Sequence, residues 1–217
     1  MHLDSMGESV QTIIRQRAYT IRPGQVFALN APYNGGTHLP DITVITPVFD
    51  TAGQSILFYL GARGHHADVG GITPGSIPAF SGTVDEEGVL IDDFLLVEAG
   101  RLRETELREI LASGPHPARD IDQNVADFKE QIAANEKGIQ ELLKMVDHFG
   151  LDVVQSYMKH VKDNAAESVR RVLDALSDGS FELTLDHGGT IKVSITVDKA
   201  ARRAKVDFSG TSRQVPT

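Results

Sequence analysis

The sequence predicts an α+β fold with a mixed β-sheet region and glycine-rich loops, a long helical hairpin, and a C-terminal β-meander. Apolar residues alternate with period two between residues 41 and 98, and again between residues 180 and 208. Between residues 125 and 176 they recur at every third or fourth position. The first pattern is typical of strands and the second of amphipathic helices, so helices are expected to separate two β regions.

The N-terminal part is expected to contain a helix, a turn and a strand. Residues 5–17 carry apolar side chains at helical spacing, and Pro23-Gly24 interrupts the pattern before the strand-like "QVFALN". The segments "ITVITPVF", "SILFYLGA" and "GVLIDDFLLV" are then predicted to be strands, divided by loops rich in glycine and proline. These segments indicate a sheet whose loops carry function.

Helices are predicted in the second half, beginning with a short one from Glu104 to Leu111. The first long helix carries an apolar stripe of Val125, Phe128, Ile132, Ile139, Leu142, Leu143 and Val146. Gly150 is expected to cap its C-terminus. The second long helix, from about Asp152 to Leu176, carries Val153, Val154, Tyr157, Met158, Val161, Val169, Val172 and Leu176 on its expected buried side. Packing of these two helices as a pair explains both stripes.

The chain is expected to divide into three regions of one domain. Residues 1–100 form the β-rich region with the candidate site, residues 101–178 form the helical region, and residues 179–217 form the meander. Because the chain stops in a polar loop after a strand, the meander region is expected to be truncated.

Composition excludes several classes of function. The net charge of -9 argues against a nucleic-acid partner, because the phosphate backbone attracts basic proteins. The chain has no cysteine, so thiolate zinc sites and cysteine nucleophiles are excluded, and any metal must use histidine and carboxylate. No run approaches the ~18 apolar residues of a membrane span, and the N-terminus lacks the pattern of a signal peptide. A soluble, cytoplasmic protein without membrane contact is expected.

Two glycine-rich stretches carry the same His-x-x-Asp motif. "GGTHLPD" places His38 three residues before Asp41, and "GHHADVGG" places His65 three residues before Asp68, with His66 beside it. Their convergence would favour a metal or catalytic site over surface histidines in polar loops. Mixed histidine and carboxylate ligands suit zinc, manganese or iron, and the sequence does not separate these metals.

A hairpin would bring the motifs together. If "DITVITPVFD" and "QSILFYLGAR" turn at "TAG", the numbers of facing residues sum to roughly 104. Asp41 would then face Arg63, and His65 would face Leu39. The glycine pairs beside the motifs, at residues 35–36 and 70–71, permit positive φ and close approach to a ligand, although simple turns are the alternative.

Several long blocks resemble the hydantoinase B/5-oxoprolinase family, in the same order. The blocks are "NAPYNGGTHLPDITVITPVF", "GARGHHADVGGITPGSIP", "DEEGVLIDDFLL", "DQNVADFKEQIAANEKGIQEL", "FGLDVVQSYMKHVKDNAAESVR" and "VDFSGTSRQV". The block "RGHHADVGGITPGS" is most similar to the 5-oxoprolinase branch. Measured against that family, the chain looks like an internal fragment of the B half.

The resemblance implies a hydrolase that acts on a cyclic amide C-N bond. Such 5-oxoprolinases, which belong to glutathione metabolism, convert 5-oxo-L-proline to L-glutamate at the expense of ATP. The ATP-binding A half, with Mg, phosphorylates the amide oxygen, and the B half completes ring opening and hydrolysis. The A half is therefore the expected partner, in an oligomer. Because the chain lacks a G-x-x-x-x-G-K-[ST] loop, it is expected to be inactive alone.

The resemblance also implies a ligand set. Related carboxylases hold a metal with a His-x-x-Asp motif and a downstream histidine, which fall here on His38, Asp41 and His65. His66 is the alternative ligand and a catalytic candidate. Manganese, zinc and iron all remain open.

Other polar residues have two explanations each. Asp68 is either a base or a partner that fixes a histidine tautomer, or else a loop-capping carboxylate. Glu87 is a candidate general acid or base, and a surface glutamate is the plainer explanation. Gln131 and Asn135 lie one helical turn apart and could hold a polar ligand, but ordinary hydrogen bonds between structural elements are preferred.

Three functions stay open at this point. The first is part of an ATP-dependent 5-oxoprolinase. The second is a sister enzyme, an ATP-dependent hydantoin hydrolase of the N-methylhydantoinase kind or an acetone-type carboxylase subunit. The third is a scaffold without catalytic residues that docks the A half.

Overall fold

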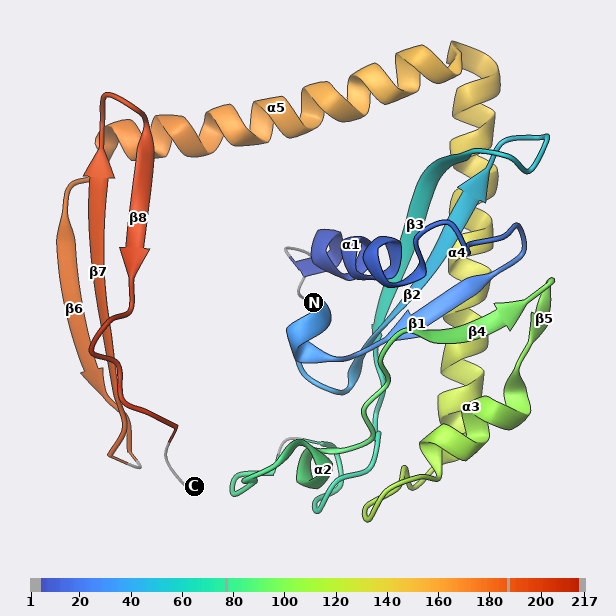
Figure 1. The fold of residues 1–217 in the computed structure, drawn as a ribbon, viewed down its shortest axis with the longest axis horizontal. Helices are drawn as coiled ribbons and strands as arrows, with labels where there is room; N and C mark the ends of the chain where they lie inside the picture. The colour runs from blue at the N-terminus through green and yellow to red at the C-terminus, as the bar shows by residue number, and fades with distance from the viewer. Residues whose placement is uncertain (1–4, 77, 187, 215–217) are drawn as a thin grey trace. The chain divides into compact units, whose positions relative to one another are not determined.

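Five antiparallel strands form the sheet that carries the candidate site, in the order β3-β2-β1-β4-β5 (Figure 1). The strands are β1 (Val26–Leu29), β2 (Asp41–Phe49), β3 (Ile56–His65), β4 (Phe94–Glu98) and β5 (Arg101–Leu102). The structure, a computed structural model, describes residues 5–76, 78–186 and 188–214. The sheet belongs to the first of two units, Met1–Leu143, and Lys144–Thr217 form the second.

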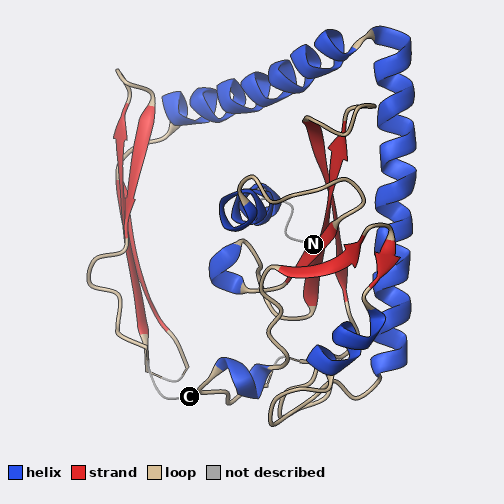
Figure 2. Cartoon of the chain, turned by 45° about the vertical axis from the view of Figure 1, so that its right-hand side comes forward, coloured by secondary structure: helices blue, strands red, loops and turns tan. Residues whose placement is uncertain are grey.

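Helices cover both faces of this sheet. The helices and turns of the first unit are α1 (Met6–Arg17), η2 (Pro32–Asn34), α2 (Val84–Glu87), α3 (Glu104–Leu111) and α4 (Ile121–Phe149), which continues into the second unit. Figure 2 shows the sheet between α1 and α4.

Alternation along the strands divides the core between the two faces. The cluster beside α3 and α4 contains Val26, Ala28, Ile42, Val44, Leu107, Val125 and Phe128. The cluster beside α1 contains Ile13, Phe27, Leu29 and Ile45. Because successive strand residues point to opposite faces, even-numbered residues of β2 face α4 and odd-numbered ones face α1.

The segment before β4 is not a strand, although "GVLIDDFLLV" predicts one. β4 begins only at Phe94. The buried side chain of Asn30 holds this segment, because it donates to the carbonyl of Val89 at 3.0 Å and accepts from the amide of Ile91 at 2.7 Å. The backbone amide of Asn30 also donates to the carbonyl of Ile91 at 2.8 Å. Asp93 then has φ 48°, which turns the chain into β4.

The predicted helices form close to their predicted bounds. α3 spans Glu104–Leu111, and α4 ends one residue before Gly150. Gly150 has φ 87° and its amide donates to the carbonyl of Val146 at 2.8 Å, as expected of a C-terminal cap. Across the described ranges, no helix has both the length and the apolar character needed to cross a membrane.

The second unit contains α5 (Leu151–Ala175) and a three-stranded antiparallel meander. The strands are β6 (Gly179–Thr184), β7 (Thr190–Asp198) and β8 (Arg203–Asp207), and β7 lies in the middle. The predicted C-terminal meander is therefore confirmed, and residues 215–217 of its predicted region lie outside the described residues.

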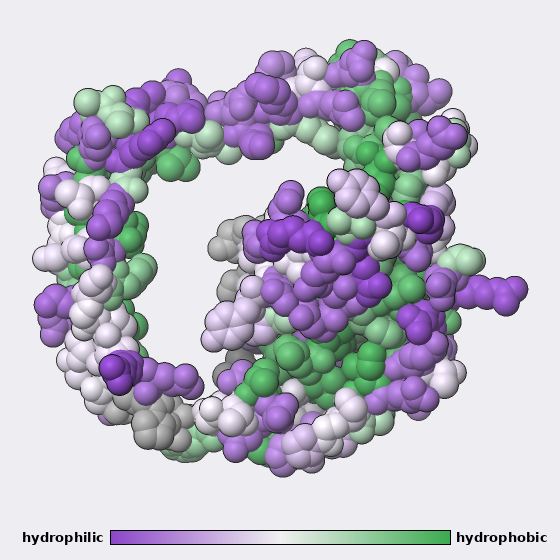
Figure 3. Space-filling view, viewed as in Figure 1, coloured by the Kyte–Doolittle hydropathy of each residue, from purple (hydrophilic) through white to green (hydrophobic). Residues whose placement is uncertain are grey.

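One face of this meander is apolar and exposed. The register pairs Phe181 with Val193 and Ile195 with Val206, so these side chains share a face. Phe181 is 65% exposed, and Figure 3 shows hydrophobic residues along one side of this sheet. The alternation predicted the strands correctly, but an alternating pattern does not specify what covers the apolar face.

The expected burial of the α5 stripe is wrong for most of its members. Val154 is buried, whereas Val153, Tyr157, Met158, Val161, Val169, Val172 and Leu176 are exposed. The predicted packing of the two long helices as a pair therefore does not account for the α5 stripe. Helical periodicity identifies which residues share a face, but burial requires a second surface with matching side chains.

Replacing Phe128 with alanine should lower the free energy of unfolding by ~3–5 kcal/mol, the usual cost of emptying a buried aromatic site. Phe128 is 0% exposed in the cluster beside α4. Phe80, which is 77% exposed in the same unit, supplies the control, and Phe80→Ala should change stability by less than ~0.5 kcal/mol. Urea denaturation followed by circular dichroism measures both, and equal losses would contradict the packing described.

Candidate metal centre

The β2–β3 hairpin brings the two His-x-x-Asp motifs together at its open end. Asp41 pairs directly with His65 across the two strands. The predicted register, in which Asp41 faced Arg63, is wrong by two residues, since Arg63 pairs with Thr43. A shift of two keeps every side chain on its predicted face and moves His65 closer to Asp41 than expected.

The turn explains the difference in register. The pairing shifts between Val48 and Phe49, and the amide of Asp50 donates to the carbonyl of Ser55 at 2.9 Å. The connection is therefore longer than the "TAG" turn assumed from the sequence. Neither the longer turn nor the irregular pair interrupts the apolar alternation, so the sequence pattern does not reveal them.

His38, Asp41 and His65 form a trio whose ligand atoms lie within 4.8 Å of one another. His38 Nδ1 is 3.6 Å from Asp41 Oδ2, and the two imidazole rings have centroids 5.1 Å apart. Atoms that bind one ion at ~2.1 Å can be no more than ~4.2 Å apart. A small movement of the exposed His65 ring would therefore bring the trio to coordination distance.

The trio offers a donor set that fits a divalent metal. Two imidazoles and one carboxylate, leaving further positions open, are typical of catalytic zinc and non-haem iron sites. The side chain of Asp41 is 3% exposed and accepts a hydrogen bond from Thr37 Oγ1 at 3.3 Å. Among the described residues no lysine or arginine forms an ion pair with Asp41. A buried carboxylate in this position would be stabilised by a cation.

Close packing of the backbone holds the loop that carries His38. Gly35 has φ 89°, and a Cβ there would lie 2.2 Å from the amide nitrogen of Ser9. At Gly36 a Cβ would lie 2.2 Å from the carbonyl oxygen of Asn30. The glycines thus permit contact with other backbone segments, which is the structural use of glycine rather than the predicted approach to a ligand.

Arg63 fixes the same loop from the α1 face, a contact the sequence analysis missed. Its buried guanidinium donates to Thr43 Oγ1 at 2.7 Å, to Ser9 Oγ at 2.9 Å and to the carbonyl of Gly35 at 2.9 Å. The charge of Arg63 at an inward position of an apolar strand was the sequence signal that could have predicted these contacts. It joins α1, β3 and the His38 loop beside the trio.

His66 does not join the trio. Its ring is 1% exposed and contacts Phe128 of α4 edge-on at 4.9 Å between centroids, on the sheet face opposite to α1. Nε2 lies 3.1 Å from Gln131 Oε1, and Nδ1 lies 3.1 Å from Asn124 Nδ2. Burial lowers the pKa of His66, although the Gln131 hydrogen bond and the charge of Asp127 act in the opposite direction. Both ring nitrogens are engaged, so the structure gives no support to His66 as a ligand or base.

Asp68 stabilises the loops around it. Its carboxylate accepts hydrogen bonds from the amides of Gly70, Gly75 and Arg119 at 2.9, 3.2 and 3.1 Å, and pairs with the Arg119 guanidinium at 2.7 Å. Burial alone would raise the pKa of Asp68, but these hydrogen bonds outweigh it and hold the pKa below its ordinary value. This geometry favours the loop-capping explanation over a base.

Glu87 lies at the end of α2, and its carboxylate accepts a hydrogen bond from Ser81 Oγ at 3.2 Å. The metal-ligand cluster found among the described residues does not include it. Glu87 therefore stays a candidate general acid or base that this structure does not place with the trio.

Gln131 and Asn135 bind backbone rather than a ligand cavity. Gln131 Nε2 donates to the carbonyl of Ile42 at 2.9 Å, and Asn135 Nδ2 donates to the carbonyl of Val44 at 3.1 Å. The two buried amides thus attach α4 to β2. The structure therefore shows hydrogen bonds between structural elements, which is the explanation preferred from the sequence.

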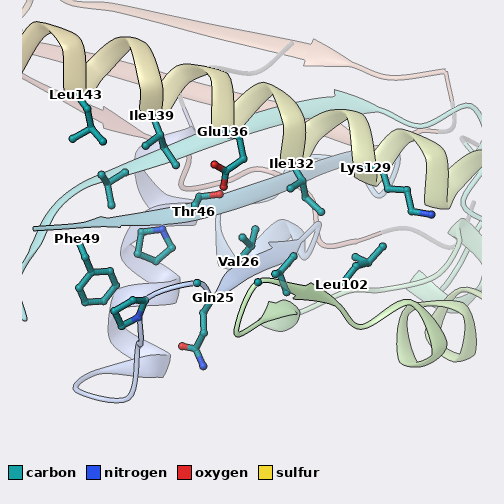
Figure 4. A pocket seen from close by; sticks show the side chains of 16 residues that line it. Gln25, Val26, Thr46, Phe49, Leu102, Lys129, Ile132, Glu136, Ile139 and Leu143 are labelled. Atoms are coloured by element: carbon teal, nitrogen blue, oxygen red, sulfur yellow. The ribbon is translucent and has the colours of Figure 1, made fainter. Parts of the chain in front are cut away.

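A separate pocket of about 600 Å³ lies on the α4 face (Figure 4). Val26, Thr46, Ile132, Glu136 and Ile139 are among its lining residues, and none of the trio lines it. Its walls are mainly apolar. Since it contains no cluster of metal-ligating or nucleophilic groups, the chemistry of the trio makes the trio the better candidate site.

Comparisons with known proteins are consistent across the whole chain. The hydantoinase B/oxoprolinase family model matches residues 1–217. The 5-oxoprolinase of Dictyostelium discoideum and 5-oxoprolinase 1 of Arabidopsis thaliana are each 37% identical over 99% of this chain. The chain spans 17% and 19% of these two relatives. The solved structure of ATP-dependent caprolactamase from Pseudomonas jessenii is 25% identical with a TM-score of 0.80, over 99% of this chain and 37% of its own.

Asp68→Asn should lower the free energy of unfolding by about 1 kcal/mol near neutral pH, since the amide loses the charge that pairs with Arg119. The pKa of Asp68 is lowered in the folded chain, so its contribution is fully present above pH ~4 and is lost as the pH falls through the folded-state pKa. The difference from wild type should therefore shrink in acid.

Denaturation curves between neutral pH and pH 3 measure this difference. The exposed Asp85 supplies the control, because Asp85→Asn should show no comparable convergence with wild type. A gap between Asp68→Asn and wild type that stayed constant down to acid pH would contradict the lowered pKa.

Proposed function

This chain belongs to the hydantoinase B/oxoprolinase family, and we propose that it forms the metal-bearing part of an ATP-dependent 5-oxoprolinase that hydrolyses 5-oxo-L-proline to L-glutamate. The observation that carries the proposal is the convergence of His38, Asp41 and His65 in a chain 37% identical to 5-oxoprolinases. The likeness to a caprolactamase, named for another cyclic amide, supports the same class of substrate.

ATP would be handled by a partner. No phosphate-binding glycine loop is present in the sequence, and the caprolactamase is named as ATP-dependent. We therefore assign ATP binding to an A-type half, either fused or separate, and the ring-opening step to this part. The chain covers less than a fifth of the two eukaryotic relatives, which leaves room for such a half in the same polypeptide.

The residues of the trio have distinct tasks in this proposal. Asp41, buried and hydrogen-bonded by Thr37, supplies a fixed negative ligand. His38 and His65 supply neutral nitrogen ligands, and the exposed His65 leaves the site open to substrate. A divalent manganese, zinc or iron ion bound there would polarise the activated amide and lower the pKa of water. Once the amide oxygen is phosphorylated, the metal would be needed only for the hydrolysis step.

Elemental analysis of the purified chain should find about one manganese, zinc or iron ion per chain, the stoichiometry of a three-ligand catalytic site. His38→Ala and His65→Ala should each lose most of this metal, because removal of one of three ligands leaves two. His160→Ala, which removes an exposed histidine of α5, should retain it. Absence of stoichiometric metal from the wild type, or full retention by His38→Ala, would favour the scaffold function instead.

The substrate class can be tested by ATP hydrolysis with an A-type partner. We expect 5-oxoproline to stimulate hydrolysis more than hydantoin or acetone, and His38→Ala to abolish that stimulation. Without the partner, no compound should stimulate ATP hydrolysis. Stimulation by hydantoin or acetone but not by 5-oxoproline would indicate a sister enzyme. Stimulated ATP hydrolysis without any partner would refute the assignment of ATP binding to the A-type half.

A further inference from the structure

His66 lies next to a trio residue in sequence but belongs to the opposite face of the sheet. β3 ends at His65, and the following ring is enclosed by Phe128, Gln131 and Asn124 of α4. A buried imidazole with two hydrogen bonds is costly to place unless its partners are fixed.

The hydrogen-bond network selects one tautomer of His66. Gln131 Nε2 donates to the carbonyls of Ile42 and Ala62 at 2.9 and 3.3 Å, so the oxygen Oε1 is the atom that faces His66 and can only accept. Nε2 of His66 must therefore carry the proton. Asn124 Nδ2, which also donates to the carbonyl of Asp68 at 2.9 Å, then donates to Nδ1. Both contacts are satisfied by the neutral Nε2-H ring.

The backbone of His66 reaches the other half of the site. Its amide donates to the carbonyl of Pro40 at 2.9 Å, and Pro40 lies between His38 and Asp41. The amide of Ile42 donates to the same carbonyl at 3.0 Å. Residue 66 is thus attached to α4 by its ring and to the "HLPD" loop by its amide.

Gln131 completes the connection between the two strands. Its amide group contacts Ile42 of β2, Ala62 of β3 and the ring of His66, which follows β3. These points flank Asp41 and His65 on the chain. A single helix therefore fixes the spacing between the two motifs from behind the sheet.

We propose that His66 is a positioning residue that sets the distance between His65 and the His38–Asp41 pair. The inference rests on the proposed function, because it takes the trio as the metal site. The ligand atoms lie within 4.8 Å and must close to a narrower geometry around an ion, so displacement of the strand end by half an ångström would matter. His66 acts through the backbone and touches neither metal nor substrate.

The test compares His66→Phe with Asn135→Ala in the 217-residue chain. Phenylalanine fills the space of the ring and removes both hydrogen bonds. Asn135→Ala removes an equivalent buried amide that attaches α4 to Val44 and Thr46, one helical turn beyond Gln131. It is a matched control for the loss of stability, because it does not contact the ends of either motif.

Calorimetric titration with Mn²⁺ and with Zn²⁺ provides the readout, after circular dichroism has established that each variant is folded. His66→Phe should weaken binding ~10- to 100-fold, the usual effect of removing a residue that orients a ligand. Asn135→Ala should bind within about threefold of wild type, because it leaves every contact of His66 and Gln131 in place. His66→Gln, which keeps a donor toward Gln131, should recover part of the affinity, and it carries the test if the phenylalanine variant fails to fold.

The outcomes separate the two proposals. Equal affinity for wild type, His66→Phe and His66→Gln overturns the positioning role while the trio stands. Equal loss in His66→Phe and Asn135→Ala also overturns it, since general destabilisation would then account for the effect. If the wild type binds neither ion, the proposed metal site fails, and the positioning role fails with it.

Discussion

The register of the β2–β3 hairpin is the constraint on which the candidate site depends. Asp41 and His65 are a facing pair, so one antiparallel ladder brings together residues that are far apart in sequence. The apolar residues of β2, buried on both faces, fix which side of the sheet each residue occupies. The turn and the irregular pair at Val48 and Phe49 then decide which residues face one another. A different turn would preserve the core and separate the ligands.

The sheet also separates two kinds of polar cluster. On the α1 face lie the trio and the Arg63 contacts that hold the Gly35 loop. On the α4 face, Asn124 and Gln131 enclose His66 and attach the helix to strand carbonyls. The first cluster is open enough for a ligand, whereas the second is fully buried. A buried hydrogen-bond network behind an open site is an arrangement that can keep ligating side chains in position.

The second unit has a different physical character. Its meander presents an apolar face with Phe181 and Val206 exposed, and most of the α5 stripe is exposed too. The trio, by contrast, lies entirely in the first unit. The 25% identical caprolactamase shares the fold of both units at a TM-score of 0.80.

The sequence by itself determined the fold class, the helix bounds, the meander and the family, because these follow from periodicity and from long contiguous motifs. The local His-x-x-Asp spacing identified the two motifs, and the family resemblance implied His38, Asp41 and His65 as the ligand set. Tertiary structure decided that His65 joins His38 and Asp41 whereas His66 is buried against α4. It also decided that Asp68 caps loops through Arg119 and that the Asn30 side chain holds the segment before β4. Those outcomes depend on contacts between distant segments, whose geometry is set by turn length and helix packing rather than by any local pattern.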